Sequence, residues 1–212
     1  MRKKQYVLPF ALSALVLLSP VAYPLVEAAQ AQAVTDEVII TLNVDAGISI
    51  TSPADASMSQ NLSVSANTAV ASTVWNVKTN NSAGYTIAVK ATTSPALRNA
   101  SNNIADYTPA VAATPETWDV ASTAEFGFSA FGTDISTGTW GTDSDCIAGA
   151  NVPSAGLKYR DFDTSDIQIG SRSATTTPSG VDTTVCYAVE QDGFYVPSGT
   201  YVATVVATAA TQ

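Results

Sequence analysis

The sequence predicts an all-β protein, and more narrowly an antiparallel β-sandwich of immunoglobulin-like or jelly-roll-like Greek-key type with eight to ten strands. Two observations predict this fold. Short runs alternate apolar and polar residues with a period of two, as strands do when one face meets a core and the other meets water. Clusters of Gly, Pro, Asn and Asp separate these runs, which is typical of a sandwich or barrel. Residues 95–105 are the one modest helix candidate after the N-terminal region.

The expected strands follow one another along the chain. The first alternating run spans Val38–Val44 and resumes at Ile48 and Ile50. Further runs lie at residues 62–65, 75–77, 85–89, 126–130, 185–189 and 201–207. Residues 92–117 and 132–156 alternate less and are expected to form long connections on the same sandwich.

The segment around residue 80 predicts a core hairpin. Trp75 and Val77 are expected to face the core on one strand, and Tyr85 and Ile87 on the next. Residues 80–84 would form the turn, because Asn and Gly tolerate the left-handed backbone conformations of a tight connection.

The N-terminus predicts export. Three basic residues, Arg2 to Lys4, precede an apolar run from Val7 to Val21 and an Ala-x-Ala site that ends at Ala33. This order is that of a secretory signal peptide, expected at residues 1–33 and cleaved after Ala33, with Ala31 as the second choice. A transmembrane anchor is the alternative, but a span needs about 20 apolar residues and prolines interrupt this shorter run. Residues 34–212 would then be a single domain, secreted or at the cell surface, with no membrane span after cleavage.

The charge of the mature part argues against two classes of partner. Removal of three basic residues and one acid leaves 6 basic and 17 acidic side chains, a net charge of −11. Such a chain is repelled by nucleic acid and by anionic lipid, so neither is expected as a partner. The plainer interpretation is that the acidity keeps an exported protein soluble.

Cys146 and Cys186 are the two cysteines of the chain. An even number of cysteines in an exported protein predicts a disulfide, with two free thiols as the alternative. A zinc site is not expected, because the chain contains no histidine to complete one.

The residue types also argue against an enzyme. Without histidine, the usual Ser-His-Asp and Cys-His mechanisms are impossible. The sequence has neither a phosphate-binding loop with lysine nor a G-x-S-x-G elbow. Paired carboxylates of a glycosidase stay open, since spacing in sequence does not give spacing in space. We expect no catalytic residues.

One acidic run is a calcium candidate, and no other cofactor is expected. Asp161, Asp163 and Asp166 alternate on a predicted turn, and such carboxylates can surround a hard cation. The run lacks the glycine and the terminal glutamate of an EF-hand loop. The alternative is a solvated acidic loop beside Lys158 and Arg160.

One segment also carries a resemblance to a family. Residues 74–87, Val-Trp-Asn-Val-Lys-Thr-Asn-Asn-Ser-Ala-Gly-Tyr-Thr-Ile, resemble the W-x-V-x-T-N-N-x-x-G-Y-x-L signature of uncharacterised secreted proteins of candidate-phyla (Patescibacteria-like) bacteria. Residues 106–110, 126–130 and 197–201 are similar to the same family. The resemblance implies a secreted or surface β protein and no particular activity. A fainter similarity is to WxL-type cell-wall-binding domains, whose paired Trp-x-Leu motifs this chain lacks.

Three functions follow as expectations. The first is a secreted or cell-surface structural or adhesion protein without catalytic activity. The second is a protomer of a filament or surface lattice, because residues 34–51 are apolar, alternating and near the cleavage site, as strand donation to a neighbour requires. The third is a carbohydrate-binding module that stacks sugars on Trp75, Trp118 or Trp140, although Trp75 is more readily a core residue. Self-association and a cell-wall or surface glycan are the corresponding partners.

Overall fold

The computed structural model describes residues 36–51, 53–149 and 151–212, and the expected signal peptide lies outside them. The chain divides into two compact units, Met1–Leu42 and Asn43–Gln212. Residues 36–42 of the first unit form neither helix nor strand, and their side chains are exposed. The second unit contains one four-residue helix, α1 (Thr137–Trp140), and eight strands. The strands are β1 (Ile48–Ile50), β2 (Thr68–Thr79), β3 (Tyr85–Ala91), β4 (Ala105–Asp106), β5 (Ala124–Gly132), β6 (Ile167–Arg172), β7 (Val181–Gln191) and β8 (Val205–Thr211).

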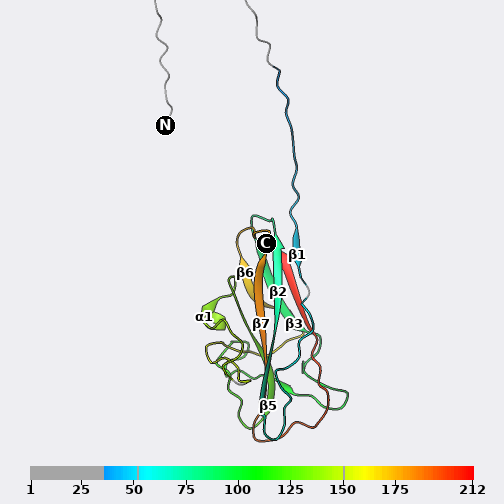
Figure 1. Cartoon of the computed structure of the whole chain (residues 1–212), viewed down its shortest axis with the longest axis vertical. Helices are drawn as coiled ribbons and strands as arrows, with labels where there is room; N and C mark the ends of the chain where they lie inside the picture. The colour runs from blue at the N-terminus through cyan, green and yellow to red at the C-terminus, as the bar shows by residue number, and fades with distance from the viewer. Residues whose placement is uncertain (1–35, 52, 150) are drawn as a thin grey trace, which may run out of the picture. The chain divides into compact units, whose positions relative to one another are not determined.

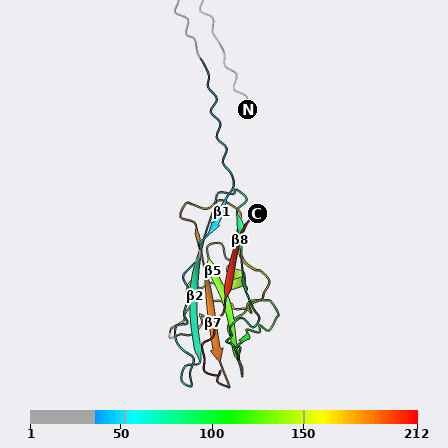
Figure 2. The same cartoon turned by 90° about the vertical axis from the view of Figure 1, so that its right-hand side faces the viewer.

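The strands form two sheets, which confirms the predicted β-sandwich class. The larger sheet has the order β1-β2-β7-β5-β4, and the smaller has the order β6-β3-β8 (Figures 1 and 2). Every pairing is antiparallel except that of β4 with β5. Antiparallel pairing agrees with the alternation in the sequence, because such sheets can leave one face in water.

The space between the sheets holds the main core. β3 supplies Tyr85, Ile87 and Val89, each fully buried, while β5 supplies Phe126 and Phe128. Phe162 stacks on both phenylalanines, with ring centroids 5.4 and 4.4 Å away. A second cluster lies on the opposite face of the larger sheet and includes Val70, Tyr107, Leu157, Tyr159 and Cys186. β5 and β7 are therefore buried on both faces.

The predicted hairpin between Trp75 and Tyr85 is wrong. β2 belongs to the larger sheet and β3 to the smaller one, so residues 80–84 carry the chain from one sheet to the other. The two strands face each other across the core instead of lying side by side. Gly84 does adopt a positive φ of +84°, and a Cβ atom there would collide with the backbone carbonyl of Arg172. Glycine is therefore required at this crossover for two reasons.

Other local expectations are corrected as well. The run Val38–Val44 forms no strand in this chain, and residues 62–65 form a turn closed by a bridge from Ser63 to Ala66. Residues 95–105 contain no helix. The final strand begins at Val205 and not at residue 201, and β6 was not predicted. Alternation without a neighbouring strand to pair with is not sufficient to form a strand, which explains the first two errors.

Candidate functional site

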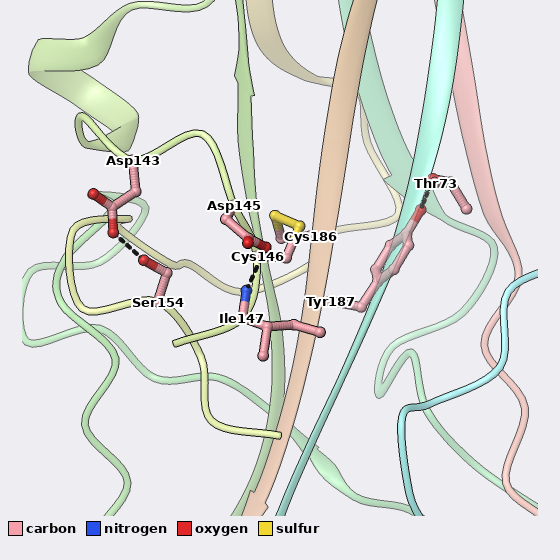
Figure 3. Close-up of a disulfide and its surroundings, with 8 residues drawn as sticks. All are labelled: Thr73, Asp143, Asp145, Cys146, Ile147, Ser154, Cys186 and Tyr187. Carbon is pink, nitrogen blue, oxygen red and sulfur yellow. Dashed lines mark hydrogen bonds between the residues drawn. A yellow bond between two sulfur atoms is a disulfide. The ribbon is translucent and has the colours of Figure 1, made fainter. Parts of the chain in front are cut away.

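The sulfur atoms of Cys146 and Cys186 form the disulfide that the sequence suggested, with the two Cα atoms 5.4 Å apart. Cys186 lies on β7 and is fully buried, while Cys146 belongs to the long connection after α1. Figure 3 shows that Cys186 and its neighbour Tyr187 point to opposite faces of β7. Such a bond is typical of an oxidising compartment. Closing a loop of 40 residues stabilises the fold by about 4 kcal/mol in the chain-entropy account.

Further contacts hold the connection around the disulfide in place. The hydroxyl of Ser154 donates to the Asp143 carboxylate, and the Ile147 amide donates to Asp145 at 3.1 Å (Figure 3). Next to them, Trp118 stacks on Tyr107 with ring centroids 4.6 Å apart. Burial raises the pKa of Tyr107 to about 12. This side of the larger sheet is covered by packed side chains and offers a ligand little room.

The three aspartates of the calcium candidate do not converge on one point. Asp161 pairs with Arg160 at 3.2 Å, and Asp166 pairs with Lys90 at 3.2 Å. Asp163 accepts a hydrogen bond from the Ser165 amide at 3.0 Å, which lowers the pKa of its carboxyl. Within the described residues, no three acidic or cysteine side chains are grouped to hold a metal ion.

Asp161 and Asp163 do share a small pocket of about 400 Å³ with Asp106. Burial raises the pKa of the Asp106 carboxyl, and the Ala96 amide, which donates to it, partly offsets that shift. Since each carboxylate already has a partner of its own, this pocket is not the candidate site.

A larger cavity is a groove of about 830 Å³ at the side of the sandwich, lined by both apolar and polar side chains. Its wall on the larger sheet is formed by β2, β7 and β5, through Ala71, Trp75, Tyr187 and Phe126 among others. The opposite wall comes from the chain that enters β8, through Tyr201, Ala203 and Val205, and residues 53–62 border it on a third side. A cavity of this size lies within the range of about 300–1,000 Å³ that is usual for ligand sites.

Residues near the groove are less buried than the residues with which they pair on neighbouring strands. Ile87 and Val89 of β3 are fully buried, but their partners on β8, Ala209 and Ala207, are only half-buried. Paired residues lie on the same face of a sheet, so the difference must come from what covers them. The same contrast holds in the larger sheet, where Trp75 is half-buried and its partner Thr183 is fully buried. Among the described residues, Trp75 at the groove and Ala207 and Ala209, which follow the lining residue Val205 along β8, are therefore less covered than their partners.

The tryptophans lie in three separate places and form no common platform. Trp140 packs on Phe128 and is 3% exposed. Trp118 donates to the Glu190 carboxylate at 2.6 Å on the opposite face of the larger sheet. Trp75 was expected in the core, but it is half-buried at the wall of the groove. Its Nε1 atom is shielded from solvent and has no hydrogen-bond partner in the part of the chain that the structure describes.

Beyond these sites, one exposed apolar segment precedes the sandwich. Val38, Ile40, Leu42 and Val44 alternate with Ile39, Thr41 and Asn43 and are between 73% and 90% exposed. Asp36 and Glu37 precede the segment, and Asp45 follows it. A row of large apolar side chains in water is unfavourable, by about 25 cal/mol for each Å² of apolar surface left exposed.

The sequence indicated this segment but not the groove. The groove arises where residues from β2, β7, β5 and the approach to β8 meet, and these are far apart in sequence. Comparison of the chain with protein-family models, curated proteins and solved structures finds no significant match. Across residues 36–51, 53–149 and 151–212, no helix is both long and apolar enough to span a membrane.

Proposed function

We propose that this chain is an exported structural protein of the cell surface, without catalytic activity, that works by assembling with copies of itself. The observation that carries the proposal is the exposed apolar row from Val38 to Val44. A soluble monomer gains nothing from four such side chains in water, whereas a protomer can bury them against a neighbour.

Two further observations support the proposal. The disulfide is typical of an oxidising environment outside the cytoplasm. The expected signal peptide would direct the chain to such an environment. Among the residues that line the groove are apolar side chains, such as Trp75, Ala203 and Val205, that the exposed row could contact.

The test uses the expected exported form, which begins at Val34. Size-exclusion chromatography and negative-stain microscopy should show oligomers, filaments or sheets that grow with protein concentration. A protein that stays monomeric at high micromolar concentration, with its disulfide formed, would contradict self-assembly.

A carbohydrate-binding role is the second candidate, because of the aromatic side chains Trp75, Tyr187 and Tyr201 in the groove. Aromatic rings commonly form part of ligand sites. A glycan array with the wild type and Trp75→Ala distinguishes the two roles. Glycan binding that Trp75→Ala abolishes, in a protein that stays monomeric, would favour this role over assembly.

A further inference from the structure

We propose that residues 38–44 of one copy lie in the groove of a second copy as an extended strand, added to the free edge of β8. This inference rests on the proposed self-assembly and names the two surfaces that carry it. Strand addition of this kind takes its affinity from main-chain hydrogen bonds and its specificity from alternate side chains in pockets.

The sheet edges point to β8 as the acceptor. In the described residues the two sheets end at four strands: β1, β4, β6 and β8. β1 has three residues and β4 has two, while β6 carries Arg172 and an irregular register against β3. β8 has seven residues, Val-Val-Ala-Thr-Ala-Ala-Thr, and keeps a regular register. Proteins usually protect an exposed edge with charge, proline, a bulge or shortness, and β8 has none of these protections.

The hydrogen-bond pattern shows which backbone groups are free. The Thr204 carbonyl accepts from the Thr92 amide, so even-numbered residues of this strand face β3. In an antiparallel ladder, residues alternate between one neighbour and the other. The amides and carbonyls of Val205, Ala207 and Ala209 therefore face the opposite edge, where the described chain places no backbone partner against them. The side chains of the same three residues are the half-buried ones that border the core.

The donor matches this edge in length and chemistry. Residues 38–44 number seven, like β8, and contain no charge. An extended run of seven residues spans about 20 Å, and Val38, Ile40, Leu42 and Val44 all point to one side of it. Placed beside Ala203 and Val205, which line the groove, that side faces Trp75, whereas β1 lies close to the other end of β8. The exposed row and the half-buried margins would then cover each other.

The occupant is a second copy because, in the chain that carries them, Val38, Ile40, Leu42 and Val44 are 73–90% exposed and therefore fill no groove of their own copy. Asn80 holds the chain at the start of the sandwich, accepting from the Gly47 amide at 2.6 Å and donating to the Asp45 carbonyl at 2.8 Å. Asn80 follows Trp75 by five residues, a distance of about 17 Å along a strand. Val44 is adjacent to Asp45 and is therefore held near Asn80, so it cannot lie beside Trp75 of its own chain. Another copy has no such restraint, and each copy offers both a donor and an acceptor, so the contact can repeat head to tail.

The test compares variants of the two surfaces in the exported form. The donor variant is Ile40→Asp with Leu42→Asp, and its control places the same charges on the other side of the segment, Thr41→Asp with Asn43→Asp. The acceptor variant Ala71→Trp fills the groove, and its control is Val74→Trp on the exposed face of the same strand. Ala207→Pro, which removes an amide at the free edge, is a second acceptor variant. Thermal melting confirms that each variant folds.

We expect the donor and acceptor variants to be monomers and the two controls to assemble like wild type. An equimolar mixture of the donor variant and Ala71→Trp should form dimers and nothing larger, because one functional donor meets one functional acceptor. If wild type assembles and folded acceptor variants assemble equally well, this inference is wrong while the proposed function stands. If wild type does not assemble, the proposed function itself fails.

A crosslinking experiment tests the same contact without disturbing it. A photoreactive residue at position 40 of ¹⁵N-labelled protein, mixed with unlabelled protein, should crosslink to peptides containing β8 or Trp75 of the unlabelled copy. Crosslinks confined to one labelled chain, or to other surfaces, would overturn the inference.

Discussion

The two faces of the larger sheet differ sharply in how completely other parts of the chain cover them. On the face that carries Cys186, long connections cover β5 and β7, and a disulfide and stacked aromatic rings hold them in place. On the inner face beside β2, the groove leaves Trp75 and the β8 residues only half covered. The same sheet is thus closed within the chain on one side and open on the other.

This difference reflects which segments of the chain cover the sheet and which do not. Residues 133–149 and 151–156, which apart from α1 are irregular in structure, help to cover the closed face. The segment Val38–Val44 precedes the sandwich, and its large apolar side chains are exposed. The contrast predicts that the closed face contributes stability to the single chain, and that the open margin contributes to association.

The largest expected effect is on the closed face. Replacing both Cys146 and Cys186 with alanine should lower the free energy of unfolding by about 4 kcal/mol, since the constraint on the unfolded chain is lost. The melting temperature of a domain of this size should fall by roughly 8–16 °C. Hydrogen exchange should accelerate in residues 140–157 more than in β8. A double variant that melts within about 2 °C of oxidised wild type would contradict a stabilising role for the bond.

The open margin should tolerate loss of a large side chain better than the core does. Trp75→Ala should cost about 2 kcal/mol, whereas the buried Trp140→Ala should cost the ~3–5 kcal/mol typical of a fully buried aromatic ring. Thermal or urea unfolding of the two variants in monomeric protein measures the difference. Equal losses would show that Trp75 is as well packed as Trp140 and that the margin is not open.

Two tyrosines of the closed face form a matched pair. The Tyr107 hydroxyl donates to the Thr117 carbonyl at 3.1 Å and accepts from the Asp119 amide at 3.2 Å. The buried hydroxyl of Tyr159 has no such partner among the described residues. Tyr107→Phe should therefore cost about 1–2 kcal/mol, and Tyr159→Phe should be close to neutral. Urea unfolding checks this order, which a larger loss for Tyr159→Phe would reverse.

The smallest effect concerns pH. Burial raises the pKa of the Glu190 carboxyl above its unfolded value, and the hydrogen bond from Trp118 only partly offsets the shift. The folded state then binds a proton more tightly than the unfolded state does, so this group adds stability at low pH and loses that contribution as the pH rises through the folded pKa. The melting temperature of wild type, measured relative to that of Glu190→Gln, should rise as the pH falls from 7 towards 4. A difference that does not change over this range would contradict the shift.

The fold class could be predicted from the sequence because alternation records which face of a strand is buried. β3 and β7 were recognised in this way, and Cys146 and Cys186 could be paired because the chain has no other cysteine. The pairing of β2 could not be predicted, since a tight turn such as residues 80–84 serves a hairpin and a change of sheet equally well. Gly84 is required in either case, so it does not distinguish them.

Of the two surfaces discussed above, the sequence indicated only the exposed segment Val38–Val44 and not the groove. Val38–Val44 has the alternation of a strand, and its failure to pair within the chain was visible only in the structure. The groove depends on three-dimensional neighbours, such as Ala203 and Trp75, that have no shared sequence pattern. Trp75 was expected to be buried because tryptophan usually is, but it lies half-buried at the wall of the groove.

The order of strands in the larger sheet also governs when the domain can fold. β2 pairs with β7, and the hydrogen-bonded side chains of Thr73 and Tyr187 are 114 residues apart in sequence. Such distant pairings make folding slow, in the millisecond-to-second range, because a long loop must close before any contact rewards it. All residues from β2 to β7 must therefore be synthesised before the central pair can form. Cys186 lies on the same late strand, so the disulfide must also wait. If the chain is exported as proposed, this delay would keep the polypeptide unfolded for passage through a narrow channel.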